Sequence, residues 1–204
     1  MVASISSELL RGLRLTLVIF AVTGLVYPLV GTGLAQAIFH DQASGSLVTR
    51  NGQVVGSRLI GQQFAKPEYF HGRPSATVDP SDSSKAVPYN AANSAGSNLA
   101  PSNSTLIDRV SKDVDAVRQE NGLGGDAQVP ADLVTTDFSG IDPDITEASA
   151  LLQVDRVAQA RSLDAAKVRA VVERHVQGRV LWIFGEPHVD VLDVNMALDA
   201  GEAG

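Results

Sequence analysis

Residues 15–39 read LTLVIFAVTGLVYPLVGTGLAQAIF, a run without a charged side chain. At about 1.5 Å per residue, a helix of this length exceeds the ~30 Å hydrocarbon core of a bilayer. Arg11 and Arg14 precede the run, whereas Asp41 follows it in a chain of net charge −7. Because basic residues favour the cytoplasmic side, we expect a cytoplasmic tail over 1–14, one transmembrane helix over 15–39 and an extracytoplasmic domain over 40–204.

A cleaved secretory signal is the alternative for this segment, since Ala35-Gln36-Ala37 has the small-x-small form of a cleavage site. The apolar region of a signal usually covers about 7–15 residues. The run before Ala35 is longer, which favours a retained anchor.

Small residues and one proline recur at three- and four-residue spacing along the expected span. They are Ala21, Gly24, Pro28, Gly31 and Ala35. In lipid, small side chains let two helices approach closely, so we expect this stripe to contact a neighbouring helix. The alternative is that a transmembrane helix merely tolerates glycine and proline. No Asp, Glu, Lys, Arg or His lies within the run, so this helix alone offers no site to carry an ion.

The remainder of the chain predicts a single α+β domain. Asn51-Gly52 lies between two β-prone runs and indicates a hairpin. Helical patterns follow from a cap at Ser102, Asn103 or Ser104 to an end at Asn121-Gly122, from Asp142-Pro143 onward and from Ser162 onward. Two further stretches, 180–185 and 188–196, predict extended structure. Between the hairpin and the first of these helices, residues 74–103 show no helical or strand period, and so long a loop in a compact domain is usually functional or disordered.

The sequence excludes several kinds of chemistry. It contains no cysteine, which rules out disulfides and thiolate metal sites. It has no Gly-Lys-Ser/Thr phosphate loop, no Asp-Lys-Thr-Gly phosphorylation motif and no Gly-x-Ser-x-Gly elbow. The four histidines are scattered, and no basic cluster suits nucleic acid. We therefore expect no catalytic residue, no metal site, no tightly bound cofactor and no nucleic-acid partner.

Eight motifs, in order along the chain, resemble the KdpC family, the C subunits of potassium-transporting Kdp ATPases. They are LRGLRLTLVIFAVTGLVYPLV (10–30), GSLV with NGQVVGSRLIGQQF (45–64), YFHGRPSA (69–76), GSNLAPSN (96–103), PADLVT (130–135), SGIDPDIT (139–146), QVDRVAQAR (153–161) and GEPHVDVLDVNMAL (185–198).

The resemblance implies an accessory subunit of a high-affinity, ATP-driven potassium uptake complex in the bacterial inner membrane. Its partners would be the channel-like potassium-binding subunit KdpA, the P-type ATPase subunit KdpB and the small subunit KdpF. The family's role is to assemble or stabilise the complex and to raise the ATP affinity of the ATPase subunit, without hydrolysing ATP itself. The resemblance also makes Gln153 the candidate nucleotide contact, the alternative being a glutamine on a helix surface.

Within the long loop, the resemblance favours a shaped surface that meets a partner subunit. The candidate contact residues are Tyr89, Asn90, Ser94, Gly96, Ser97, Asn98 and Pro101. Asn and Ser tolerate tight turns and offer short hydrogen-bonding groups. The alternative is a loop that covers its own domain and caps the next helix. For the whole chain, the competing hypothesis is a membrane-anchored binding module or hydrolase unrelated to potassium transport.

Overall fold

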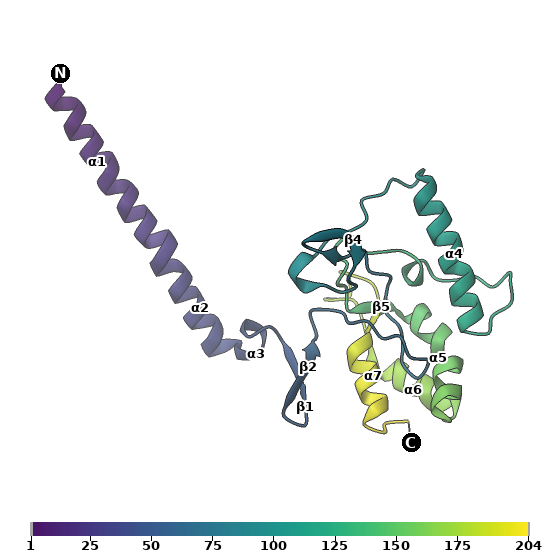
Figure 1. Cartoon of the computed structure of the whole chain (residues 1–204). Helices are drawn as coiled ribbons and strands as arrows, with labels where there is room; N and C mark the ends of the chain where they lie inside the picture. The colour runs from purple at the N-terminus through teal and green to yellow at the C-terminus, as the bar shows by residue number, and fades with distance from the viewer. Residues whose placement is uncertain (1, 204) are drawn as a thin grey trace. The chain divides into compact units, whose positions relative to one another are not determined.

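The computed structural model describes residues 2–203 and divides the chain into two compact units, Met1–Leu47 and Val48–Gly204. The first unit is mostly helical (Figure 1): α1 (Val2–Ala21), a π-helical turn (Val22–Val26), α2 (Tyr27–Ile38) and the short α3 (His40–Ala43). From Ile5 to Ile38 this helix is long and apolar enough to cross a membrane. The expected transmembrane segment is thus helical, and most of the tail before it is helical as well.

The π-helical turn has a local cause. Pro28 has no amide hydrogen, and within a regular α-helix its ring would clash with the carbonyl of Gly24 four residues back. The chain widens just before this point, so that the Tyr27 amide donates to the Val22 carbonyl five residues earlier. A wide turn of this kind inserts about one extra residue, which is about 100° of rotation.

This rotation changes the expected stripe of small residues. Ala21 precedes the wide turn, whereas Pro28, Gly31 and Ala35 follow it on α2. The prediction that all five residues follow regular α-helical spacing was wrong, because the π-helical turn interrupts it. The three residues on α2 keep a common face, and Ala21 is turned away from it.

The second unit opens with the hairpin expected around Asn51-Gly52. Strands β1 (Leu47–Arg50) and β2 (Gln53–Ser57) pair with each other. Asn51 and Gly52 have φ of 52° and 77°, the two positive angles that a type I′ turn needs. The hairpin prediction is confirmed.

The long loop is more ordered than its composition indicated. It contains an antiparallel hairpin of β3 (Val78–Asp79) and β4 (Asp82–Ala86), and a 3₁₀ turn over Ala91–Asn93. The expectation of no regular element over 74–103 was therefore wrong. Serine hydroxyls and amides stabilise the hairpin locally; for example, the Ser81 and Ser84 side chains donate to Asp79 and Asp82.

The helices mostly match their sequence patterns, but two start later than expected. α4 (Ser104–Glu120) is capped by the Asn103 side chain, one of the three candidate caps. Residues 144–146 form strand β5, and Thr146 caps α5 (Glu147–Arg161). Ser162 ends α5 with φ of 55°, and Asp164 instead caps α6 (Ala165–His175).

The core lies between α5, α6, α7 (Val191–Asp199) and a small sheet of order β5-β7-β6, where β6 is Val176–Gln177 and β7 is His188–Asp190. Fully buried valines from all three helices and from β7 meet the ring of Phe70 in one cluster. The extended structure expected over 188–196 is present only in β7, because Asp190 caps a helix there by accepting from the amide of Asp193. Residues 180–185 form a tight exposed turn rather than a core strand.

Asp190 predicts a dependence of stability on pH. It is 4 % exposed and lies directly opposite Asp144 in the β5–β7 ladder. Burial, with the nearby carboxylates Asp193 and Asp144, raises the pKa of Asp190 from 3.8 to about 6. The folded state therefore holds this proton more tightly than the unfolded chain, and the free energy of unfolding should fall as pH rises from about 4 to about 6.

An Asp190→Asn variant keeps a capping oxygen but cannot ionise. We expect it to unfold with a free energy about 1–2 kcal/mol above wild type at pH 7, and with no gain at pH 4. Denaturant unfolding at both pH values measures this, with Asp155→Asn on exposed helix surface as control. Equal differences between wild type and Asp190→Asn at the two pH values would contradict the prediction.

Candidate functional site

The motif YFHGRPSA crosses the domain as an extended segment whose backbone is held by buried side-chain amides. Asn195 on α7 accepts from the Phe70 amide (2.8 Å) and donates to the Phe70 carbonyl (3.0 Å). Gln153 on α5 does the same for His71, at 2.8 and 3.1 Å. Each side-chain amide therefore satisfies the backbone amide and carbonyl of one residue, as a neighbouring strand would do in a sheet.

Arg156 extends this network. Its guanidinium donates to the carbonyls of Pro67 (2.6 Å) and Tyr69 (2.9 Å), and to the side chains of Gln153 and Asn121. Burial lowers the pKa of Arg156 from its ordinary value, an effect that the charge of Glu120 opposes. Segment 67–71 is thus fixed against α5 and α7 through polar groups that are themselves buried.

The structure places Gln153 inside the domain, 1 % exposed. Its oxygen accepts from His71 and Arg156, and its nitrogen donates to the carbonyls of His71 and Ser149. The alternative of a glutamine on the helix surface was wrong, because this residue lies on the buried face of α5. The nucleotide contact stays a prediction, and it would require a nucleotide to displace one of these four bonds.

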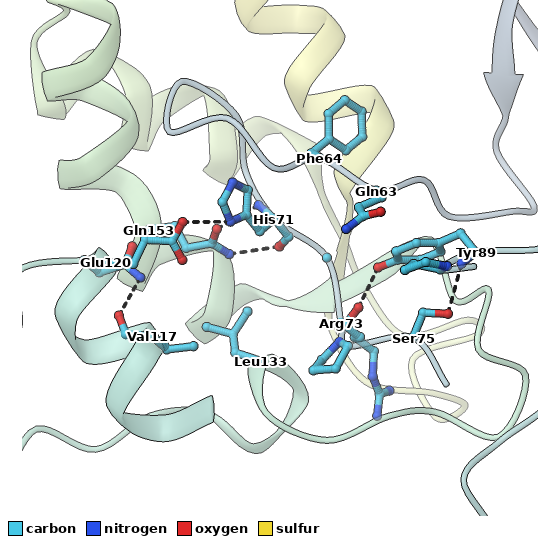
Figure 2. A pocket seen from close by; sticks show the side chains of 14 residues that line it. Gln63, Phe64, His71, Arg73, Ser75, Tyr89, Val117, Glu120, Leu133 and Gln153 are labelled. Atoms are coloured by element: carbon cyan, nitrogen blue, oxygen red, sulfur yellow. Dashed lines mark hydrogen bonds and ion pairs between the residues drawn. The ribbon is translucent and has the colours of Figure 1, made fainter. Parts of the chain in front are cut away.

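A pocket of about 230 Å³ opens beside this segment (Figure 2). Polar residues line it on two sides, with His71, Glu120 and Gln153 on one and Arg73 and Ser75 on the other (Figure 2). The pocket has apolar and aromatic side chains as well. Its lining includes Phe64, Val117, Leu133 and Tyr89.

Charged groups in the pocket are paired within the domain. His71 Nδ1 lies 3.1 Å from Glu120, and the other ring nitrogen lies 3.0 Å from the Lys66 carbonyl. Arg73 contacts Asp142 at 3.1 Å, while its buried Nε has no hydrogen-bond partner among the residues described. The pocket is therefore mixed in charge, and its Ser75 and Tyr89 hydroxyls donate to backbone carbonyls.

Tyr89 is a structural residue of this pocket. Its hydroxyl donates to the Arg73 carbonyl (2.7 Å) and its amide donates to Ser75 (Figure 2). Burial, with the charges of Asp137 and Asp142, raises the pKa of Tyr89 to about 12, so the hydroxyl remains a donor at neutral pH. The ring fits only beside glycines, since a Cβ at Gly61 or Gly72 would lie 2.6 or 2.5 Å from Tyr89 atoms.

The candidate contact loop divides into an inner and an outer part. Asn90 donates to the Val78 carbonyl and caps the 3₁₀ turn, so it and Tyr89 serve the domain itself. Gly96 lies against the backbone of residues 137–138, and the Ser94 hydroxyl donates to the Ser139 carbonyl. Ser94, Asn98 and Pro101 are exposed, whereas Gly96 and Ser97 are half-buried.

Sequence reasoning missed Asn195 and Arg156, the partners that hold the YFHGRPSA segment. Their signal is present in the sequence: on α5 and α7, polar residues occupy positions within the apolar face, beside Val154, Val157 and Val194. A polar residue in such a position is normally buried with a partner.

Three of the histidines in the described part of the chain are engaged in local contacts, and they form no metal-holding group. Across residues 2–203 no group of three or more His, Asp or Glu side chains could hold a metal ion. The rings of His71, His175 and His188 contact backbone carbonyls or carboxylates. These three histidines therefore have no hydroxyl nucleophile to activate.

The chain thus combines one N-terminal helix that is long and apolar enough to cross a membrane with a separate α+β domain. Residues 9–200 match the family model described as KdpC, K+-transporting ATPase, c chain. The chain belongs to the KdpC family.

Its relatives are similar over almost the whole chain. Potassium-transporting ATPase KdpC subunits of Rhodopseudomonas palustris strain BisB18 and Bradyrhizobium diazoefficiens are 54% and 52% identical to it, each match covering 96% of this chain and 98% of the relative. The KdpC subunit of Methylobacterium nodulans is 53% identical over 98% of each chain.

Proposed function

We propose that this chain is a non-hydrolysing accessory subunit of a high-affinity, ATP-driven potassium uptake complex, which it assembles or stabilises. The observation that carries the proposal is the likeness to potassium-transporting ATPase KdpC subunits over nearly the full length.

We place the domain outside the cytoplasm of a bacterial inner membrane. Arg11 and Arg14 lie on the N-terminal side of the charge-free run 15–39, and acidic residues dominate the remainder. With this topology the domain cannot touch cytoplasmic ATP. An effect on the ATP affinity of the ATPase subunit would therefore be a coupling free energy transmitted across the membrane.

The proposed partners are KdpA, KdpB and KdpF. On α2 the common face of Pro28, Gly31 and Ala35 suits close packing against another membrane helix. In the domain, the exposed residues Ser94, Asn98 and Pro101 suit contact with the channel-like subunit.

ATPase activity as a function of potassium tests the proposal, in a Kdp complex purified with wild-type chain, without it, and with the Gly24→Leu/Gly31→Leu variant. Neither glycine is crowded in its own helix, since Gly31 has nothing and Gly24 only the Phe20 ring within 4 Å. We expect omission of the chain to abolish potassium-stimulated turnover. We expect the amount of the double variant that co-purifies with the complex to be at least tenfold lower than that of wild type.

A matched control, Leu29→Val, changes an exposed apolar residue of α2 without filling the small-residue face. It should behave as wild type. Normal assembly and turnover without the chain would contradict the proposed role. Normal recovery of the double variant would show that the small-residue face is not the contact.

A further inference from the structure

Residues 179–186, between β6 and β7, form a narrow turn with an apolar tip. The amides of Val180 and Phe184 each donate to the other residue's carbonyl, at 2.8 and 2.9 Å. Every side chain between these two bonds is exposed, and Trp182 is 93 % exposed. The tip consists of Val180, Leu181, Trp182, Ile183 and Phe184.

The domain itself gives no reason for this shape. Leu181 and Trp182 have φ of 52° and 65°, a left-handed conformation that costs bulky residues roughly 1–2 kcal/mol each. Burying a large apolar side chain contributes about 1.5–3 kcal/mol, and this tip gains none of that within the domain. A strained, solvent-exposed apolar turn indicates a surface whose burial occurs against something outside the domain.

We propose that this tip inserts into the interfacial layer of the membrane that the chain's own helix crosses. A turn that docks into a pocket on another protein would need apolar side chains on only one of its sides. Here the side chains on both sides and at the apex are apolar and exposed. Lipid can surround the tip on every side and so bury all of these apolar side chains together. Tryptophan favours the membrane interface, and the flanking ion pair of Arg179 and Glu186 suits the polar headgroup level.

The tether permits this contact. Residues 39–47 lie between the end of α2 and the start of the second unit and include the short helix α3, so with the remaining residues extended they reach roughly 20 Å. A domain of this size has a radius of gyration of about 15 Å. Rotation about the tether can therefore bring the tip to the bilayer surface, and the membrane anchor keeps the local concentration of lipid high.

Trp182 is the chain's single tryptophan, so its fluorescence reports directly on the tip. We would place the full-length chain in phosphatidylcholine nanodiscs with or without brominated acyl chains. The expected result is quenching of Trp182 by brominated lipid and weak quenching by aqueous acrylamide. Ile183→Asp should lose the lipid quenching and increase acrylamide quenching several-fold, whereas Ile183→Leu should match wild type.

Phe138→Ser is the positional control, because this ring is 96 % exposed on another segment; its signal should equal that of wild type. The proposal is overturned if wild-type Trp182 is open to acrylamide and unquenched by brominated lipid. It is also overturned if Ile183→Asp retains the lipid quenching, or if protection arises only when the other Kdp subunits are present, which would identify a protein as the occupant.

Discussion

Replacing Gln153 with alanine is expected to lower the free energy of unfolding by about 3–4 kcal/mol. The side chain is fully buried, and its amide makes both hydrogen bonds to the backbone of His71. Removing it leaves a buried donor and acceptor without partners, at roughly 1–3 kcal/mol each, and opens a cavity. Arg156 also loses its acceptor in Gln153. Denaturant unfolding of the purified chain in detergent measures the change.

Gln159→Ala is the matched control, because Gln159 lies on the exposed side of the same helix. It should change the unfolding free energy by less than about 0.5 kcal/mol. The same pair of variants separates two roles of Gln153. If Gln153→Ala left stability unchanged and weakened the ATP affinity of the assembled complex, a role of Gln153 in nucleotide affinity would be supported and the structural role proposed here would fail.

The sequence allowed the prediction of the elements whose signals are local. The helix over the charge-free run, the Asn51-Gly52 turn and a cap among residues 102–104 depend on neighbouring residues, and all three were found as expected. Failures occurred where a distant contact decides the conformation. β5 pairs with β7, more than 40 residues later in the chain, so the first residues after Asp142-Pro143 became a strand before the helix began.

The site was less predictable, because its groups become neighbours only in the folded domain. Tyr89 and Asn90 belong to a loop whose composition predicts no regular structure. In the fold, however, Tyr89 fits beside two glycines that are distant in sequence. In the sequence, Gln153 is simply a polar residue on a helix, and its partner, the backbone of His71, is distant along the chain. In both cases the residue type is visible in the sequence, but the partner that gives it a role is not.

Gly140→Ala is the second large effect, with an expected loss of about 3–4 kcal/mol in the free energy of unfolding. Gly140 has φ of +68°, and a Cβ there would lie 2.6 Å from both the Ala95 carbonyl and the Thr77 methyl. The left-handed conformation costs an L-residue roughly 1–2 kcal/mol, and overpacking adds about 1–3 kcal/mol. The backbone of the loop must therefore move, since the Ala95 oxygen is not the end of a flexible side chain.

Gly122→Ala isolates the backbone cost, because Gly122 has a similar φ of +64° and nothing within 4 Å of an added Cβ. It should lose only about 1–2 kcal/mol, so the difference between the variants measures how tightly residues 94–98 lie on residue 140. If that loop contacts a partner subunit, Gly140→Ala should also reduce recovery of the Kdp complex at a temperature where the chain is still folded, whereas Gly122→Ala should not. Equal losses of stability in the two variants would mean that the loop shifts freely, and a loop that shifts freely is not the preformed contact surface expected from GSNLAPSN.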